Sequence, residues 1–462
     1  MKLWNEIRKC LIENEKQKVC EGKTDNTYGG LLAFAESCAG LIVKYKCVAV
    51  MCDSELMAAK AILTCFAAGV TALPIPTRYG SVYCERILSF VKPDAMITDR
   101  GGMPEIVPLK AGYEVTDADP ALIMCTSGTT GEPKGVMLTE ENVLTAVSDI
   151  TAYFDIGGDD TILIPRPLYH CAVLTGEFLT AIFKGCRICF YSGALNPVAV
   201  PELVRLCGAT VLCGTPTFWR LLISFMRRAG TMLPLGKIQV SGECLDCDTA
   251  YALADMFPAA KIYSVYGLTE ASPRVSALPP ELFPKRCDSV GLPLRSVEVK
   301  VIKSDGSEAD YGEEAVLYVK GGNVMAGYYR NAEKTAEVLC GGWLCTGDIA
   351  VIYSDGLIAI KGRADDMIIK GGMNIYPREI EEALRADRRV DEVMAYGYTG
   401  KSGMTEIGIK ISGRFGSVQE AARLCHTVLP PHEVPSRIEI VRTLEKKRVR
   451  QNQEGQINER MY

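Results

Sequence analysis

The sequence of 462 residues predicts an α/β protein: a large N-terminal domain of parallel sheets with a small β-barrel-like portion, followed by a mobile C-terminal α+β lid domain. Three observations lead to this prediction. Short apolar runs alternate with helical segments in the first half, which is typical of a parallel sheet covered by helices on both faces. From Val299 onward, short strands are separated by turns such as Ser304–Gly306, which favour antiparallel hairpins. Gly362 is then followed by a segment long enough to form a small domain.

The alternation is clearest in the first 200 residues. Helices are expected where apolar residues recur at helical spacing, and buried strands where apolar residues stand together in short runs. The expected helices are Tyr28–Val43, Glu55–Phe66, Val82–Val91, Asn142–Phe154 and Glu177–Phe183. The expected strands are Cys47–Cys52, Leu73–Pro76, Ala95–Thr98, Thr161–Ile164 and Arg187–Tyr191.

The second half predicts a β-rich portion and then a small mixed domain. The expected strands of the β-rich portion are Val299–Ile302, Ala315–Val319, Ile349–Tyr353 and Leu357–Ile360. The elements expected after it are the helices Pro377–Ala386 and Val418–Val428 and the strands Val393–Gly397 and Glu406–Ile411. We therefore expect an N-terminal domain over residues 1–361 and a C-terminal lid domain over residues 362–462.

Charge and hydropathy exclude two classes of protein. Lys and Arg total 51 and Asp and Glu total 56, so the net charge of −5 does not fit a strongly basic nucleic-acid binder. This balance still allows one small phosphorylated ligand to bind. No run of 18 apolar residues is present, so no membrane span is expected. Met1–Cys10 lacks the apolar core of a signal peptide, and we expect a cytoplasmic protein.

The 19 cysteines are expected to be reduced and mostly buried as small apolar residues. Two pairs, Cys186–Cys189 and Cys244–Cys247, have a spacing that also occurs in zinc sites. No histidine lies near either pair, and the pairs are far apart in the sequence. A zinc site is therefore not expected.

The strongest chemical signal is the segment Leu122–Gly135, in which an apolar strand runs into Ser, Thr and Gly residues and then a lysine. Small residues let backbone N–H groups approach an anion, hydroxyls add donors, and the lysine adds a positive charge. The alternative is a flexible surface turn. Because Lys134 is followed by Gly135, the segment is not a Walker loop. The candidate phosphate-binding residues are Thr126, Ser127, Gly128, Thr129, Thr130, Gly131 and Lys134.

This segment resembles the phosphate loop of the adenylate-forming superfamily, which includes acyl- and aryl-CoA ligases, luciferases and the adenylation domains of peptide synthetases. Further segments resemble that family in the order in which the family has them. They are Tyr266–Glu270, Gly327–Tyr328, Trp343–Asp348 and Gly362–Glu381. The resemblance to the acyl- and aryl-CoA ligases extends over most of the chain.

The resemblance implies a reaction in two halves. A carboxylate attacks the α-phosphorus of ATP and pyrophosphate leaves, with Mg²⁺ and hydrogen-bond donors stabilising the phosphate charge. A thiol then attacks the acyl-adenylate and AMP leaves. The implied thiol is that of coenzyme A, and the alternative is the phosphopantetheine arm of a carrier protein. The family also implies a hinge between the two domains at Asp365.

The resemblance assigns roles that the side chains can fulfil. Glu270 offers a hard oxygen to Mg²⁺, and Thr269 offers a hydroxyl to a phosphate. Asp348 suits ribose hydroxyls, and Arg363 suits ribose or phosphate, the alternative being a surface salt bridge. Further residues expected to bind the nucleotide are Tyr266, Gly267, Ser241, Gly242 and Glu243; for the last three, an ordinary strand-to-helix turn is the alternative.

His170 follows a segment that resembles the part of acyl- and aryl-CoA ligases that gates the acid pocket. In the similar adenylation domains of peptide synthetases, an aspartate a few residues on usually holds the substrate ammonium. None lies between Leu168 and Gly176, so the resemblance implies a carboxylic acid rather than an amino acid. The acid is expected to be small and hydrophobic or aromatic. For His170, the alternative to a gating role is that its side chain only packs beneath the phosphate loop. The candidate pocket residues are His170, Val173, Leu174, Trp219 and Ser264.

The chain departs from the family near its end. The family's catalytic lysine lies in a Gly-Lys-Ile segment, and here Gly455–Ile457 has Gln456 in its place. An alignment without a gap after Leu444 puts Gln451 at that position instead. Either another cation serves, or the first half-reaction is slow, or the protein binds nucleotide or acyl groups without catalysis. We favour an enzyme, because the phosphate loop, Glu270, Asp348 and Arg363 are all present.

Overall fold

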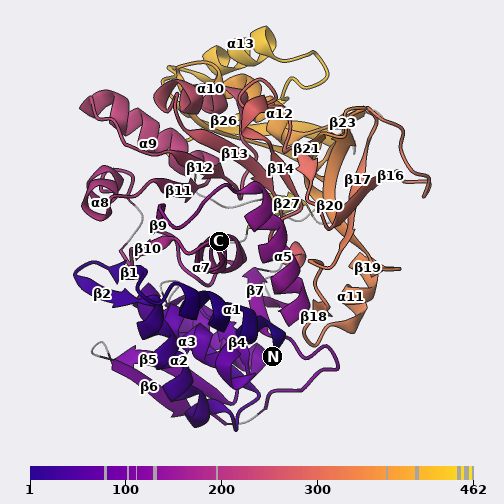
Figure 1. The fold of residues 1–462 in the computed structure, drawn as a ribbon. Coiled ribbons are helices and arrows are strands. Elements are labelled where there is room, and N and C mark those ends of the chain that lie inside the picture. Colours follow the sequence, from indigo (N-terminus) through magenta and orange to yellow (C-terminus); the bar gives the residue numbers. More distant parts are fainter. Residues whose placement is uncertain are drawn as a thin grey trace. The chain divides into compact units, whose positions relative to one another are not determined.

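The computed structural model describes residues 1–77, 81–100, 103–110, 112–127, 133–193, 196–370, 373–400, 405–444, 449–451 and 457–459. Over these residues the protein is a mixed α/β structure with parallel sheets, as Figure 1 shows, which confirms the predicted fold class. Every helix in this part of the chain is too short or too polar to cross a membrane.

The larger sheet has nine strands in the order β15-β14-β13-β12-β11-β9-β10-β1-β2. The strands from β13 to β1 in this order run parallel, so their carboxyl ends meet at one edge. The strands are β1 (Lys18–Glu21), β2 (Thr24–Thr27), β9 (Thr161–Ile164), β10 (Arg187–Phe190), β11 (Val211–Gly214), β12 (Lys237–Val240), β13 (Lys261–Tyr266), β14 (Ser276–Leu278) and β15 (Leu292–Pro293).

Helices cover both faces of this sheet. On one face, helices α8 (Val200–Cys207), α9 (Pro216–Ala229) and α10 (Cys247–Met256) share a buried core with the sheet, and α9 and α10 lie side by side in Figure 1. Along β12, Ile238 belongs to that core, whereas Gln239 points to the opposite face and accepts a 2.8 Å hydrogen bond from Tyr153 of α5. The helices that pack together around α5 are α1 (Lys2–Glu13), α5 (Glu140–Tyr153), the π-helix η2 (Leu174–Leu179) and α7 (Thr180–Phe183); η2 follows the short helix α6 (Cys171–Val173).

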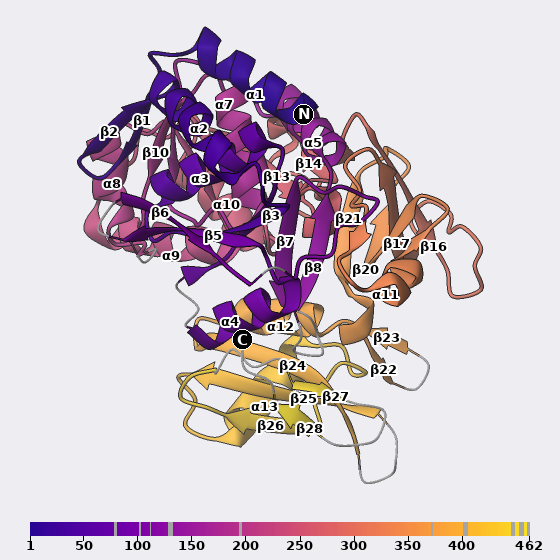
Figure 2. The same ribbon diagram turned by 90° about the horizontal axis from the view of Figure 1, so that it is seen from below.

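The second sheet has seven strands in the order β18-β8-β7-β4-β3-β5-β6. Figure 2 shows β5, β3, β7 and β8 from the side. β7 and β8 form an antiparallel hairpin, and β4 runs parallel to both β3 and β7. Its strands and nearby helices are β3 (Cys47–Met51), β4 (Thr71–Pro74), β5 (Ala95–Arg100), β6 (Met103–Pro108), β7 (Leu122–Ser127), β8 (Pro133–Leu138), β18 (Gly327–Tyr328), α2 (Tyr28–Ile42), α3 (Glu55–Ala68) and α4 (Ser81–Val91).

The β-rich portion follows the nine-stranded sheet in the chain. Its sheet has the order β16-β17-β20-β19, with β21 paired to β20. Its elements are β16 (Val297–Ile302), β17 (Glu314–Gly321), α11 (Ala332–Val338), β19 (Leu339–Cys340), β20 (Trp343–Ile352) and β21 (Ile358–Arg363); the short 3-10 helices η3 (Thr269–Ala271) and η4 (Pro280–Leu282) precede it.

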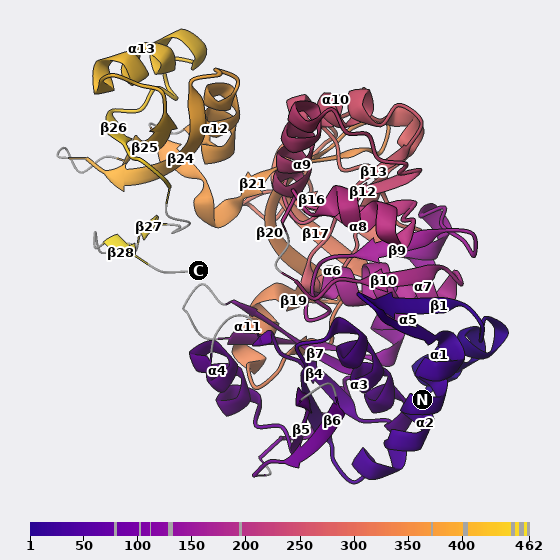
Figure 3. The same cartoon turned by 90° about the vertical axis from the view of Figure 1, so that its left-hand side faces the viewer.

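The C-terminal part has a three-stranded sheet, β24-β25-β26, against which α12 and α13 pack (Figure 3). Its core is aliphatic and includes Ile380, Ile409 and Leu424. Its elements are η5 (Ala364–Asp366), β22 (Ile368–Lys370), β23 (Met373–Ile375), α12 (Pro377–Arg385), β24 (Val390–Thr399), β25 (Thr405–Gly413), α13 (Val418–Val428), β26 (Arg437–Ile440), β27 (Val449–Gln451) and β28 (Ile457–Glu459).

The chain forms two compact units. The first takes in residues 1–299, 318–345 and 354–358, and the second takes in residues 300–317, 346–353 and 359–462. The predicted boundary between residues 361 and 362, and the mobility of the lid, stay predictions.

The cysteines differ from expectation at one place. Cys247, at the start of α10, forms a disulfide with Cys287, 40 residues later in the chain. The expectation that all cysteines are reduced is therefore wrong for this pair. No pattern in the sequence indicated this disulfide, because the zinc-site spacing considered there paired Cys247 with Cys244. Among the described residues, no group of three or more Cys, His, Asp or Glu side chains is arranged to hold a metal ion.

Candidate active site

The carboxyl edge of the nine-stranded sheet gathers many of the candidate residues. Ser241–Glu243 follows β12, Tyr266–Glu270 includes and follows the end of β13, and Arg166–His170 follows β9. In sheets of this kind, ligands bind at the carboxyl ends of the strands. Three segments that are far apart in sequence are thus brought to one edge.

The phosphate-loop candidates lie on the β7–β8 hairpin. Thr126 of β7 pairs with Lys134 of β8. The Lys134 ammonium lies 5.7 Å from the ring centre of Tyr328, whose strand β18 pairs with β8. Gly128, Thr129, Thr130 and Gly131 lie outside the described residues, and only the backbone of Ser127 is described.

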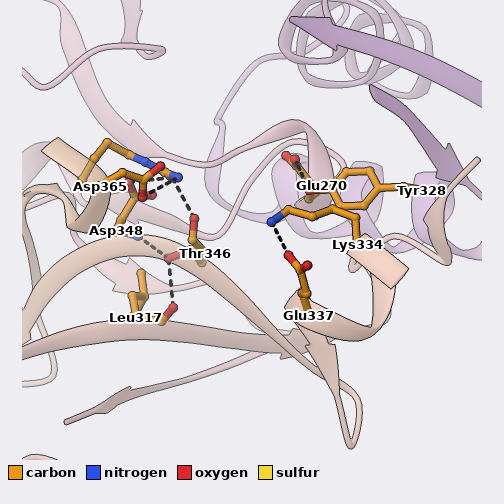
Figure 4. A network of polar contacts seen from close by, with 9 residues as sticks. Glu270, Leu317, Tyr328, Lys334, Glu337, Thr346, Asp348 and Asp365 are labelled. Carbon is orange, nitrogen blue, oxygen red and sulfur yellow. Dashed lines mark hydrogen bonds and ion pairs between the residues drawn. The ribbon is translucent and has the colours of Figure 1, made fainter. Parts of the chain in front are cut away.

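Glu270, the candidate Mg²⁺ ligand, lies in η3 directly after the β13 segment and is half-buried. The Tyr328 hydroxyl donates a 2.8 Å hydrogen bond to Glu270 Oε1 (Figure 4). The Met325 amide donates a 2.9 Å bond to the Glu270 carbonyl. Among the described residues, no hydrogen bond reaches the other carboxylate oxygen, Oε2. Tyr328 therefore joins Lys134 to Glu270; the sequence drew attention to Gly327–Tyr328 but assigned this tyrosine no role.

The turn that carries Glu270 depends on a glycine. A Cβ atom at Gly267 would lie 1.8 Å from the Pro273 carbonyl oxygen, so no other residue fits there without moving the backbone. The Val275 amide donates to the Tyr266 carbonyl at 2.9 Å, which closes the loop that holds Thr269 and Glu270. The segment Tyr266–Glu270 is thus part of a tight loop whose shape is determined by backbone contacts.

The segment Ser241–Glu243 holds one buried hydroxyl without a partner and one carboxylate that stabilises the fold. Gly242 has a φ of +91°, which favours glycine. The Glu243 carboxylate accepts bonds from the Thr217 amide at 3.1 Å and hydroxyl at 2.6 Å, and so stabilises the N-terminus of α9. The Ser241 hydroxyl is buried and has no partner among the described residues, which is the state expected of a group that binds a ligand.

Asp348, Arg363 and Asp365 belong to the second unit and form a network of their own (Figure 4). Arg363 Nη1 donates to the Thr346 carbonyl at 2.7 Å and to Asp348 Oδ1 at 3.2 Å. Arg363 Nη2 lies 3.7 Å from Asp365 Oδ1. The Thr346 hydroxyl in turn donates to the Leu317 carbonyl at 2.9 Å. Two residues expected to bind ribose and the residue expected at the hinge are therefore adjacent.

The acid-pocket candidates are not brought together. Val173 and Leu174 are fully buried where α6 passes into η2, on the α5 face of the sheet. Trp219 is fully buried in α9, on the opposite face, with its ring centre 6.0 Å from that of Phe257. Ser264 is buried in β13 beside Val240 of β12.

His170 lies at the start of α6 and is more than a third exposed. Its ring centre is 4.3 Å from that of Tyr169. Surrounding protein atoms and the positive charge of Arg166 lower the pKa of His170, so the imidazole is neutral at pH 7. A neutral ring suits contact with an acid substrate's carbon skeleton.

The sequence did not single out two buried charged residues, Glu177 and Arg274, or the largely buried Arg166 that pairs with Glu177. The one signal for them was Glu177, a lone acid in the apolar segment that was predicted as a helix. Gln456 lies outside the described residues. Gln451, its alternative, lies in β27 opposite Ile457.

Comparison with known proteins gives consistent matches. The family model described as "AMP-binding enzyme" matches residues 105–329. A feruloyl-CoA synthase of an Amycolatopsis species is 34% identical over 304 residues, which make up 66% of this chain and 59% of that protein. A long-chain-fatty-acid–CoA ligase of Salmonella typhimurium is 31% identical over 355 residues, 73% of this chain and 61% of that protein. The chain thus spans about 60% of the length of the curated relatives it matches.

Solved structures share the whole fold. ATP-bound MatB from Rhodopseudomonas palustris aligns with a TM-score of 0.83 at 23% identity, covering 98% of this chain and 97% of that one. The o-succinylbenzoate-CoA synthetase MenE of Bacillus subtilis, in complex with the acyl-adenylate intermediate OSB-AMP, aligns with a TM-score of 0.82 at 22% identity, covering 98% and 96%. The described fold is therefore that of these proteins over nearly its whole length.

Proposed function

We propose that the chain is an AMP-binding enzyme that activates a carboxylic acid with ATP and transfers the acyl group to a thiol, as its family match and its relatives support. In the first half-reaction a carboxylate oxygen attacks the α-phosphorus of ATP and pyrophosphate leaves. In the second, a thiolate attacks the acyl carbon and AMP leaves. The observation that carries the proposal is the meeting of Lys134, Tyr328 and Glu270 beside the β7–β8 hairpin.

The side chains at this place fit a metal-bound polyphosphate. Glu270 is held by Tyr328 through one oxygen, which leaves the other in position to bind a cation, and carboxylate oxygen is the ligand that Mg²⁺ prefers. When bound, Mg²⁺ supplies positive charge to the phosphate oxygens. Lys134, together with the hydroxyls of Thr126 and Thr269, supplies charge and donors to the same group.

The buried, unpartnered hydroxyl of Ser241 supports a nucleotide at the carboxyl edge of the sheet. The roles of Asp348 and Arg363 toward ribose, and of Asp365 as a hinge, are part of the same proposal. Their network supports it, because Arg363 links the ribose candidate Asp348 to the hinge candidate Asp365.

Coenzyme A is the thiol that we propose, since the relatives described above are named as CoA synthase and CoA ligase. A carrier protein is the second candidate, because its phosphopantetheine arm presents the same thiol. A cytoplasmic location remains part of the proposal. The small hydrophobic or aromatic acid expected from the sequence stays a prediction.

The test is a screen of carboxylic acids with ATP, Mg²⁺ and either coenzyme A or a phosphopantetheinylated carrier protein. We expect pyrophosphate release with at least one acid, and mass spectrometry should then detect acyl-AMP and, with coenzyme A, the thioester. Samples without ATP are the control. ATP binding by calorimetry without turnover of any acid would overturn the proposal in favour of a non-catalytic binding protein.

A further inference from the structure

Three charged side chains, two of them buried and one largely buried, gather beside the segment that carries Leu174. Glu177, in the π-helix η2, is fully buried and forms an ion pair with Arg166, which follows β9. Arg274, four residues after Glu270, is only 2% exposed. We call Arg166, Glu177 and Arg274 the buried charge cluster.

The hydrogen bonds of this cluster are incomplete. Arg274 Nε and Nη2 are buried and have no hydrogen-bond partner among the described residues. Glu177 Oε2 and Arg166 Nε are likewise buried and without one. Burial of a charged group without full pairing is strongly unfavourable, so native structures keep such groups mainly where a ligand or an internal water completes them.

The cluster carries an excess of positive charge. Burial raises the pKa of Glu177, and the charges of Arg166 and Arg274 oppose this rise. Two guanidinium groups accompany one carboxylate, so the formal charge of the cluster is +1 with Glu177 ionised and +2 with it protonated. An anionic group is the ligand that would balance this charge and accept from Arg274 Nε and Nη2 together.

The backbone makes room for the Arg274 side chain. A Cβ atom at Gly176 would lie 3.1 Å from Arg274 Nη2, so the guanidinium packs directly on the backbone of η2. π-Helical turns are rare and often occur at functional sites. Here the π-helix places Leu174, Gly176 and Glu177 in one buried segment.

The cluster is also close to the metal-ligand candidate. The buried Cys171 thiol, just before this segment, has its pKa raised mainly by burial, lowered by the charge of Arg274 and raised by that of Glu270. Both charges are therefore near one side chain. Cys171 directly follows His170, the candidate gate of the acid pocket.

We propose that the acid carries a second carboxylate, which binds Arg274 within the buried charge cluster while the reacting carboxylate faces Glu270. This inference rests on the proposed function and names its substrate class: a dicarboxylic acid that is activated at one end. Arg274 is then a specificity-determining residue, and Arg166 and Glu177 position it. The small hydrophobic or aromatic acid expected from the sequence lacks the group that this cluster would bind.

The wild-type protein tests the proposal without any substitution. Pyrophosphate release is measured with straight-chain α,ω-dicarboxylic acids of increasing length, and with the monomethyl ester of each. The ester has the same chain but lacks the second charge. We expect one dicarboxylic acid to be used with a kcat/KM about 100-fold above that of its ester, as is typical when a buried polar site loses its partner.

Substitution of Arg274 then assigns the effect to a residue. For Arg274→Met, we expect the kcat/KM for the preferred dicarboxylic acid to fall about 100-fold, and the preference over the ester to shrink to less than about threefold. Arg274→Lys should recover part of the preference, because it restores the charge without the planar fork. Arg227→Met is the matched control, since Arg227 is exposed and pairs with Asp255 at the surface.

The outcomes separate this inference from the function on which it rests. Turnover of monocarboxylic acids or esters at rates equal to those of the diacids would overturn the inference but leave the proposed function intact. It would mean that internal water completes the cluster. Absence of turnover with every acid, despite ATP binding, would overturn the proposed function itself. A melting temperature of Arg274→Met within a few degrees of that of Arg227→Met ensures that lost activity reflects the site.

Discussion

The Tyr328 hydroxyl donates a 2.8 Å hydrogen bond to Glu270 Oε1, and the Lys134 ammonium lies 5.7 Å from the centre of the same tyrosine ring. One aromatic side chain thus stands between the lysine of the candidate phosphate loop and the candidate metal ligand. The hydrogen bond fixes the direction of the carboxylate, and outer contacts of this kind determine how well a ligand holds its metal.

This relationship predicts unequal effects of two substitutions. Glu270→Gln removes the charge that would bind Mg²⁺, and we expect acid-dependent pyrophosphate release to fall at least about 100-fold. Tyr328→Phe keeps the Glu270 carboxylate but removes the hydrogen bond that orients it. We therefore expect pyrophosphate release to fall about tenfold and the half-maximal rate to need a higher Mg²⁺ concentration. The measurement is a Mg²⁺ titration of pyrophosphate release.

Glu337→Gln is the matched control for the loss of one carboxylate. Glu337 is exposed on α11 and pairs with Lys334, so its loss should leave the titration unchanged. A Glu270→Gln variant with the activity of this control would remove Glu270 from the metal site.

The disulfide between Cys247 and Cys287 predicts a stability that depends on reductant. It closes a loop of 40 residues and joins α10 to the segment after η4. Loop-closure entropy for this length gives about 3–4 kcal/mol of stabilisation. We expect Cys247→Ser and reduction with dithiothreitol to lower the free energy of unfolding by similar amounts, measured by denaturant titration.

Cys340→Ser is the control, because Cys340 is an exposed free cysteine and its loss should not matter. Mass spectrometry of the alkylated native protein should find the peptides of Cys247 and Cys287 joined. Equal stability of the wild type with and without reductant would contradict the prediction.

Local patterns predicted most of the elements, because apolar spacing records which face of an element is buried. The helix Val418–Val428 and the strand Thr161–Ile164 have the predicted bounds. The helix predicted at Glu177 instead begins as a π-helix at Leu174, since a buried charge at Glu177 and packing against Arg274 determine that segment. The spacing of apolar residues in the sequence does not indicate a contact between residues as far apart as Gly176 and Arg274.

The neutral state of His170 predicts a pH effect on stability. Crowding by protein atoms and the charge of Arg166 lower its pKa from 6.5 to about 4. Between pH 6.5 and pH 4, His170 is protonated in the unfolded chain but stays neutral in the native state. The stability that this histidine contributes is therefore present above pH 6.5 and is lost as the pH falls toward 4. His170→Phe should therefore lose less stability than the wild type between pH 7 and pH 5.

Denaturant titrations at the two pH values measure this difference. His426→Gln, on the exposed side of α13, is the control and should follow the wild type. If His170→Phe and the wild type lose the same stability, the native state does not lower the pKa of His170, and the prediction is wrong.

The candidate active site could be predicted only in part, because local patterns do not show which distant segments meet. Lys134 stood out because its segment has an unusual composition, and Glu270 because Tyr266–Glu270 resembles a family segment. Arg274 did not stand out, and Tyr328 was given no role, because their roles arise where distant segments meet: Arg274 against Gly176, and Tyr328 against Glu270. A single charge or ring in a loop gives no sign of such a partner.

The last prediction concerns the family's C-terminal lysine, at whose position the resemblance puts Gln456 or Gln451. A cation that contacts both the carboxylate and the α-phosphate during adenylation lowers the barrier by a charge-assisted bond, and a glutamine cannot replace it. If Gln456 stands at that position, Gln456→Lys should raise the rate of pyrophosphate release more than about tenfold. Gln451→Lys is the matched variant, because it makes the same change at the position that the ungapped alignment favours. A rate increase confined to Gln451→Lys would make that alignment the correct one. If neither lysine changes the rate while the acid is still turned over, the missing charge is supplied by another residue, and the idea of a lost catalytic lysine has to be abandoned.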